Sequence, residues 1–309
     1  MQKPSFGARE SREDYRTVIA TDKASGVSLP MHSKIDIEKP STNDFCNQRN
    51  IGICVSCAVR TASEVHFKDG VRLSENWLAL MLEVLIEEDR FKFDEGSAIL
   101  YGLKCANKYG IPEMAMERKY PLRTDGSWEE FVNHFKVIYG GMIPQEILDN
   151  ASKHKIEGYK SVPVTPHAIA TQISEGKLIL ARFAVGDNTY LPNWKDLFPL
   201  REPKWIDGGH AWDINEYYGL DEAQMCVLVN SWSRAWGNNG YGSFIFRTQK
   251  PYFTEAWIIE KVSPKIIKEI KKLPVPAYPT WWEKFLAIIK KDNLIEWNEG
   301  LKKWVYKKK

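Results

Sequence analysis

The spacing of apolar residues divides this chain into a helical part followed by a strand-rich part. From Cys54 onward, apolar residues recur every three or four positions, as on one face of an amphipathic helix. Further helices are expected over residues 74–88, with Ser74 as N-cap, and 96–109, and helix-prone sequence covers 128–155. Strands are expected afterwards, over residues 159–164, 178–185, 212–217, 226–230, 242–247 and 257–262, with a short helix at 166–175. This order predicts an α+β fold with two lobes.

Composition suggests three segments along the 309 residues. Residues 1–44 form an irregular leader, residues 45–263 a two-lobed domain, and residues 264–309 a C-terminal extension rich in tryptophan. Within the domain, a helical lobe is expected over about residues 50–155 and a β-rich lobe over about 156–263. The extension holds 12 lysines against 5 acidic residues, so it is basic while the rest of the chain is mildly acidic.

The extension also carries apolar residues at helix-like spacing between Trp281 and Trp304. Such a segment can dock on a partner or assembly, lie on a membrane surface, or fold back on the body as a helix. We favour the last of these slightly. Nucleic-acid binding is not expected, because basic and aromatic residues without a recognisable motif are a weak signal.

The cysteine content argues for a reducing compartment. Five cysteines, at positions 46, 54, 57, 105 and 226, are odd in number and few for a chain of this length, which argues against a disulfide framework. One Cys-x-x-Cys pair occurs without a second pair, so neither a metal nor any other cofactor is expected. The first ten residues lack the apolar stretch of a secretory signal. A cytoplasmic or virus-particle location is therefore predicted.

The segment from Gln48 to Cys54 has the features of a nucleophile site. Cys54 stands at the start of the expected helix, where unpaired N–H groups and a positive partial charge favour the thiolate. The same N–H groups can bind a developing oxyanion, and the Gln48 amide could supply a second donor. Gly52 would allow a substrate to approach the main chain closely. Taken alone, Cys54 would be interpreted as a buried structural thiol.

A thiolate nucleophile needs an imidazole as ion-pair partner and proton donor, and the imidazole needs an orienting acceptor. His210 lies in Gly208-Gly209-His210-Ala211-Trp212, at the entry to an expected strand. Asn230 begins a turn after the next strand. If these two strands pair, Asn230 stands beside His210. Each residue alone has an ordinary structural explanation, but their order and local contexts together point to catalysis.

These blocks resemble the papain-like cysteine peptidase family over about residues 45–262. The matching blocks are Gln-x-x-x-Gly-x-Cys at 48–54, Leu-Ser-Glu at 73–75, Gly-Ile-Pro at 110–112, Tyr-Pro at 120–121, Gly-His-Ala at 209–211 and Asn-Ser-Trp-x-x-x-Trp-Gly-x-Asn-Gly-Tyr at 230–241. The resemblance implies a two-lobe fold, with a helical lobe, a β-barrel-like lobe and the active-site cleft between them. It also implies hydrolysis of protein or peptide substrates by a cysteine-type endopeptidase.

The family's roles transfer position by position. Gln48 matches the oxyanion-hole glutamine, Cys54 the nucleophile, His210 the general acid/base and Asn230 the residue that orients the imidazole. Trp232 matches the indole that shields the histidine–asparagine hydrogen bond. Further support of the cleft is expected from three residues of the same blocks, namely Gly52, Gly209 and Trp236.

Several positions depart from the secreted members of the family. Ile51 replaces a disulfide cysteine, Val55 a tryptophan, and Gly209 the usual Asp or Asn before the histidine. Only 53 residues precede Cys54, too few for the usual inhibitory propeptide plus the mature N-terminal segment, so latency by that route is not expected. These departures favour a prokaryotic or viral branch.

Cys57 is a rival nucleophile, but the spacing from Gln48 and Gly52 selects Cys54. Cys57 would then be a small buried apolar residue on the inner face of the helix. Two other functions remain open: an acyltransferase or crosslinking enzyme using the same thiol chemistry, and a virion or assembly component that retains the peptidase fold. Cell-wall peptidases of the NlpC/P60 type fit the Gln48 spacing and the Asn-Ser-Trp block poorly.

Overall fold

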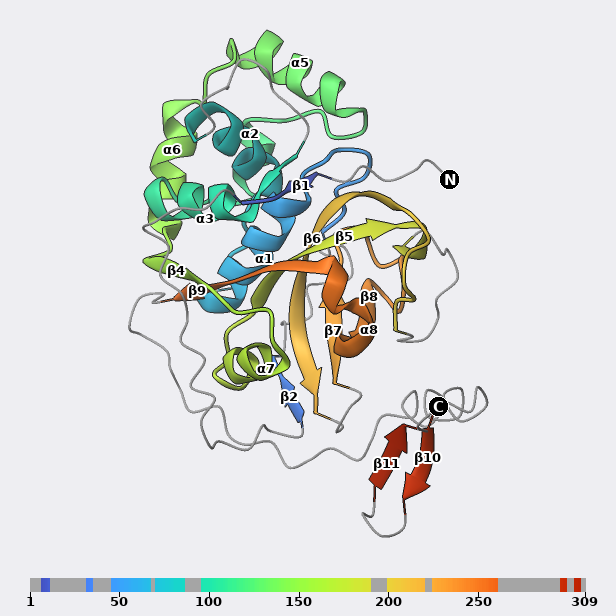
Figure 1. The fold of residues 1–309 in the computed structure, drawn as a ribbon. Helices are drawn as coiled ribbons and strands as arrows, with labels where there is room; N and C mark the ends of the chain where they lie inside the picture. The colour runs from blue at the N-terminus through green and yellow to red at the C-terminus, as the bar shows by residue number, and fades with distance from the viewer. Residues whose placement is uncertain are drawn as a thin grey trace.

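The computed structural model describes nine stretches of the chain: residues 7–11, 32–35, 46–67, 70–86, 96–189, 199–219, 224–260, 295–298 and 303–306. Figure 1 shows most of the helices gathered on one side of the molecule and the sheet on the other, with the remaining helices beside the sheet and helix α1 (Cys54–Phe67) between the two sides. This arrangement agrees with the two-lobe α+β fold expected from the sequence. The boundaries proposed for the leader, the domain and the extension stay predictions.

The helices form close to where apolar periodicity places them. Ser74 caps α2, since its side chain accepts a hydrogen bond from the main-chain N–H of Trp77 at 3.0 Å. Ser127 begins α5 with a reciprocal capping box to Glu130. The other helical bounds are α2 (Glu75–Leu85), α3 (Ile99–Lys108), α4 (Met116–Lys119), α5 (Trp128–Tyr139), α6 (Gln145–Ala151), α7 (Pro166–Ser174) and α8 (Phe246–Gln249), with 3-10 turns at Ser152–His154, Asp187–Thr189 and Lys250–Tyr252.

The main sheet has the strand order β4-β9-β5-β6-β7-β8, and β2 pairs with the C-terminal end of β6. Its strands are β2 (His32–Lys34), β4 (Gly158–Ser161), β5 (Ile179–Gly186), β6 (Ile206–Tyr218), β7 (Met225–Val229), β8 (Tyr241–Ile245) and β9 (Phe253–Glu260). All neighbouring pairs are antiparallel. Among the described strands, β4 and β8 stay unpaired to each other. The sheet is therefore open, which corrects the barrel-like closure expected for this lobe.

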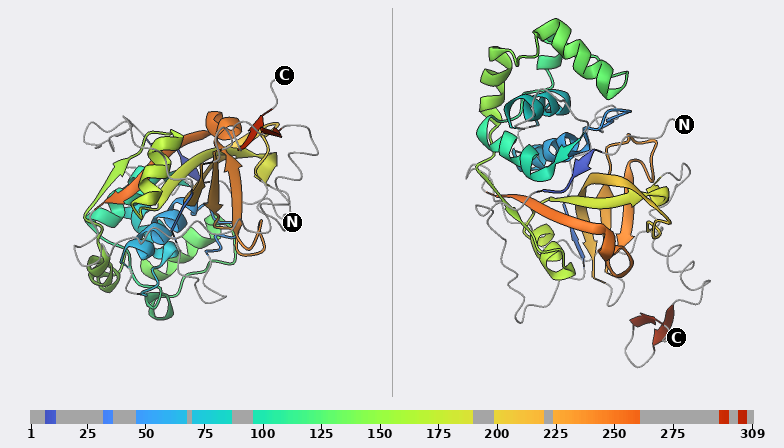
Figure 2. Two further views of the ribbon diagram at one scale, coloured as in Figure 1. Left: turned by 90° about the horizontal axis from the view of Figure 1, so that it is seen from below. Right: turned by 45° about the horizontal axis from the view of Figure 1, so that its top comes forward.

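Helix α1 packs against both halves of the molecule, as the rotated views in Figure 2 also show. It contacts α2 and α3 on one side and strands β5, β6 and β9 on the other. Its residues Val55, Ala58, Val59 and Ala62 are all at most 3% exposed. This burial fixes the direction in which the start of α1 points, toward the middle of β6.

Several short strands were not expected from sequence. Strand β1 (Ala8–Arg9) pairs in parallel with β3 (Ser97–Ala98). In the extension, β10 (Ile295–Asn298) and β11 (Lys303–Tyr306) form an antiparallel hairpin with Trp297 opposite Trp304. The helical expectation is thus wrong for these eight residues, because a short apolar run fits a period of two as well as 3.6. The remainder of the extension lies outside the described residues.

Cys46 and Cys57 form a disulfide with their Cα atoms 6.2 Å apart. The expectation of a free, buried Cys57 is therefore wrong, although the residue is buried at 2% exposure. Sequence spacing missed the bond because the loop from residue 46 to the helix returns on itself, which only the fold reveals. The disulfide also removes the argument for a reducing compartment that rested on unpaired cysteines.

Candidate active site

The segment from Cys46 to Cys57 holds the candidate nucleophile, Cys54, and Gln48 in one disulfide-closed ring. Cys54 is the first residue of α1, and the first turn carries no acidic side chain that would neutralise the helix dipole. Gln48 is 1% exposed, and its Nε2 donates to the main-chain oxygen of Ile51 at 3.1 Å. Its Oε1 accepts a hydrogen bond from the Ser231 hydroxyl at 2.5 Å. The Gln48 side chain is thereby held both by its own loop, through Ile51, and by the segment after β7, through Ser231.

His210 and Asn230 come together because β6 pairs with β7. The Nε2 atom of His210 lies 2.8 Å from Oδ1 of Asn230. Trp232 lies over the imidazole with ring centroids 4.7 Å apart, and Trp236 meets Trp232 edge-on at 5.9 Å. These two indoles exclude water from the hydrogen bond. The other ring nitrogen, Nδ1, is the one that could exchange a proton with a thiol.

The Cys54 thiol lies within hydrogen-bonding reach of the main chain of Ala211, the residue after His210, and of Gly7. Burial raises the pKa of Cys54, and these main-chain contacts oppose the rise only in part. Burial also lowers the pKa of His210 to about 3, against the opposing effect of Asn230. Both side chains are 0% exposed, so the pair is held in its neutral form in this state.

Residues 7–11, the cover segment, contribute to this burial, since Gly7 lies within hydrogen-bonding reach of Cys54. The Gly7 carbonyl accepts a hydrogen bond from the Ser97 N–H at 2.6 Å, and the Arg9 guanidinium donates to the Gly96 carbonyl at 2.6 Å. Ser11 N–H donates to the Glu255 carboxylate at 2.7 Å. These contacts anchor the segment on both the helical and the sheet side of Cys54.

The main chain of the cover segment and the main chain of its neighbours approach each other closely at three glycines, Gly7, Gly96 and Gly209. A Cβ on Gly7 would lie 2.0 Å from the carbonyl oxygen of Gly52, and one on Gly96 would lie 2.1 Å from that of Gly7. A Cβ on Gly209 would lie 2.0 Å from the carbonyl oxygen of Ala8. Latency through the usual propeptide is not expected from the sequence, and that stays a prediction; the structure places Gly7 of the preceding segment against Cys54. Sequence reasoning missed it because a two-residue strand has no periodicity.

A second feature missed from sequence is Arg182 of β5, which is 9% exposed. Its Nε donates to the Ala8 carbonyl at 3.0 Å, and its guanidinium lies against Gly209, next to His210. The one sequence signal was an arginine inside an otherwise apolar strand. A buried cation is rare unless it is paired, so the partners of Arg182 bear on its role.

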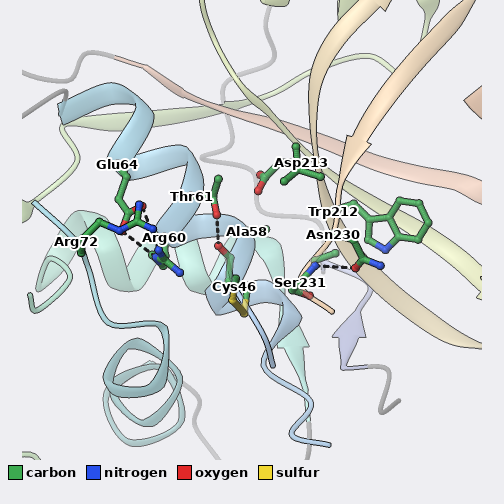
Figure 3. A pocket seen from close by; sticks show the side chains of 13 residues that line it. Cys46, Ala58, Arg60, Thr61, Glu64, Arg72, Trp212, Asp213, Asn230 and Ser231 are labelled. Atoms are coloured by element: carbon green, nitrogen blue, oxygen red, sulfur yellow. Dashed lines mark hydrogen bonds and ion pairs between the residues drawn. A yellow bond between two sulfur atoms is a disulfide. The ribbon is translucent and has the colours of Figure 1, made fainter. Parts of the chain in front are cut away.

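A cavity lined in part by Asn230 lies between α1 and strands β6 and β7 (Figure 3). Arg60 and Asp213 line it on opposite sides, and the Cys46–Cys57 disulfide closes one end. Arg60 is engaged by Glu64 at 2.8 Å, and burial raises the pKa of Asp213 well above its usual value. Neither Cys54 nor His210 lines this cavity, so it is separate from the candidate nucleophile.

Two kinds of site are not found in the part of the chain that the structure describes. It contains no group of three or more His, Cys, Asp or Glu residues placed to hold a metal ion. None of its helices is both long enough and apolar enough to cross a bilayer.

The comparisons with known proteins identify the fold. No protein-family model matches the chain, and no curated protein matches it in sequence. Among solved structures, xylellain, a cysteine protease from Xylella fastidiosa, has a TM-score of 0.65 and 20% identity, covering 84% of this chain and 97% of its own.

Two further structures superpose over most of the chain. Digestive procathepsin L 3 of Tenebrio molitor larval midgut has a TM-score of 0.54 and 15% identity, covering 78% of this chain and 73% of its own. A structure from work on the mite allergens Blo t 1 and Der p 1 has a TM-score of 0.56 and 15% identity, covering 79% and 75%. The chain therefore has a papain-like fold.

Proposed function

We propose that the protein is a cysteine-type endopeptidase with Cys54 as nucleophile. The observation that carries the proposal is the His210–Asn230 hydrogen bond of 2.8 Å, formed beside the start of the helix that presents Cys54. The papain-like fold, found in solved cysteine proteases, adds support.

In the proposed reaction the Cys54 thiolate adds to the carbonyl carbon of a peptide bond. The oxyanion is received by the Cys54 N–H and the Gln48 amide, which Ser231 holds in place. The His210 imidazolium protonates the leaving amine as the C–N bond breaks, leaving a thioester. Neutral His210 then takes a proton from water, whose oxygen attacks the thioester and releases the acid and the thiol.

Turnover requires access to Cys54 and His210, which are both fully buried. Displacing the cover segment would give that access, because Gly7 contacts Cys54 and Ala8 lies against Gly209, the residue before His210. Water reaching the pair lowers the pKa of Cys54 and raises that of His210, since burial is the main cause of both shifts. The ion pair that the mechanism needs is thus expected in the uncovered state.

The test is peptide-library hydrolysis by the full chain carrying Gly7→Val, a change expected to displace the cover segment, with and without Cys54→Ala, and labelling of both by a thiol-directed epoxide. Cys54→Ala is expected to abolish turnover and labelling. Cys105→Ala, which removes another buried free thiol, is the matched control and should retain both. Hydrolysis by Cys54→Ala would contradict the proposal. Adding an amine acceptor and weighing the products distinguishes water from amine as the acyl acceptor, and thus a hydrolase from an acyltransferase.

The prokaryotic or viral branch, the cytoplasmic or virus-particle location and the docking role of the extension stay predictions. Co-purification of the full chain with a large assembly, lost on removal of residues 264–309, would support the last of these.

A further inference from the structure

Arg182 is a buried cation whose carboxylate partner belongs to the displaceable cover segment. Its Nε donates to the Ala8 carbonyl at 3.0 Å, and its Nη1 lies 3.4 Å from the Glu10 carboxylate. Within the sheet itself, Nη1 also donates to the Thr254 hydroxyl at 2.8 Å. The Arg182 side chain is 11% exposed while that of Glu10 is 74% exposed. When the segment leaves, the guanidinium keeps Thr254 but loses a carbonyl and a carboxylate.

The residue before His210, Gly209, has no side chain, and this leaves room for the guanidinium of Arg182. A Cβ on Gly209 would lie 2.6 Å from Nη2 and 2.8 Å from Nε of Arg182. Any side chain at this position would therefore push the guanidinium away from the main chain beside His210. Gly209, which brings no side chain of its own, leaves the guanidinium of Arg182 in the wall of the candidate site.

Glu255 is the acidic residue that could neutralise Arg182 from within the sheet. The two residues are register partners on β9 and β5. Yet the Glu255 oxygens are directed elsewhere, one accepting from Ser11 N–H at 2.7 Å and the other from the Trp257 indole at 3.0 Å. Among the residues that the structure describes, no carboxylate other than that of Glu10 contacts Arg182. Once the cover segment has left, a buried guanidinium without a counter-ion is unfavourable, so a carboxylate brought by a ligand is favoured.

We infer that Arg182, seated against Gly209, selects substrates with an acidic side chain close to the scissile bond, at the place that the cover segment fills with residues 8–10. This inference rests on the proposed peptidase function. The cover segment itself is the precedent, because it offers Arg182 both a main-chain carbonyl and a side-chain carboxylate. Arginine suits this task because its planar donors match a carboxylate.

The test uses the full chain carrying Gly7→Val, which is expected to displace the cover segment. Amidated peptides are compared in pairs that differ only by Glu or Gln, with the exchanged residue moved stepwise along the peptide. At one position, Glu should raise kcat/KM by about tenfold or more over Gln. Arg182→Gln should abolish this preference, Arg182→Lys should keep part of it, and Arg182→Glu should reverse it. Denaturant unfolding monitored by tryptophan fluorescence shows whether Arg182→Gln is folded, so that loss of the preference is not mistaken for loss of the fold.

Equal kcat/KM values for Glu and Gln at every position, or a preference that survives Arg182→Gln, would overturn the inference and leave the peptidase function standing. Binding of the same peptides to Cys54→Ala, Gly7→Val separates the two claims. Binding that favours Glu through Arg182, without hydrolysis by the parent, supports carboxylate recognition and refutes the peptidase function. A further set of peptides carries a free C-terminal carboxylate. If the Arg182-dependent preference appears only with these peptides, Arg182 recognises the C-terminal carboxylate of a chain, and the inference of an acidic side chain is overturned.

Discussion

Two segments meet at Cys54, and they are held in different ways. The ring from Cys46 to Cys57 is closed by a covalent bond, is fixed by Ser231 and continues into a buried helix. The cover segment, residues 7–11, is held by scattered hydrogen bonds, and two of its five residues, Arg9 and Glu10, are exposed. The ring is therefore scaffold, whereas the cover segment can be displaced without unfolding the rest.

Displacing the cover segment should give the largest effect. Gly7→Val places side-chain atoms against the Gly52 carbonyl, since even a Cβ would approach it to 2.0 Å. Losing four hydrogen bonds of about 1 kcal/mol each should raise the rate of Cys54 alkylation about a thousandfold. Stopped-flow labelling with a small alkylating agent measures it. Gly158→Ala is the control, because a Cβ there meets its nearest atom at 3.5 Å. An unchanged rate in Gly7→Val would mean that the segment does not limit access.

Opening the ring should affect stability next. Replacing Cys46 and Cys57 by serine removes a cross-link between residues 11 apart, which should lower the free energy of unfolding by about 3 kcal/mol. Denaturant unfolding, monitored by tryptophan fluorescence, gives the value. The Cys105→Ser variant controls for placing a hydroxyl at a buried cysteine. If the double variant is as stable as wild type, the ring is not the scaffold described above.

The covered state should leave a mark on the pH dependence of stability. His210 has a pKa of about 3 when folded against 6.5 when unfolded, so the unfolded chain binds its proton first as the pH falls. Between these values, His210 should lower the free energy of unfolding by up to about 1.4 kcal/mol per pH unit of acidification. Subtracting the same measurement on His210→Gln isolates this contribution. In Gly7→Val the slope should be shallower, and equal slopes would show that the cover segment does not dehydrate His210.

Loosening Gln48 should have the smallest effect. Ser231→Ala removes the hydroxyl that donates to the Gln48 amide and leaves the His210–Asn230 bond intact. A loss of about 1 kcal/mol corresponds to a decrease in kcat/KM of about fivefold. Peptide hydrolysis in the Gly7→Val background provides the measurement. A variant with unchanged kcat/KM would indicate that the ring alone positions Gln48.

The sequence predicted most of what depends on near neighbours. The start of α1 at Cys54 and the Ser74 cap follow from residues within about one helical turn. The pairing of β6 with β7, which brings Asn230 to His210, was a conditional expectation that the sheet register satisfies. The sequence could not predict that the sheet stays open, because closure depends on strand tilt and pairing at its edges.

By itself, then, the sequence determined the papain-like fold and the two elements that carry Cys54 and His210, namely the start of helix α1 and strand β6. It did so because helix starts, caps and turns are fixed by adjacent side chains. Only the tertiary structure decided what surrounds them. The Cys46–Cys57 bond, the cover segment and the position of Arg182 against Gly209 each join residues distant along the chain or hidden in loops. Such contacts depend on where the elements lie in space, so the periodicity of apolar residues along the sequence does not predict them.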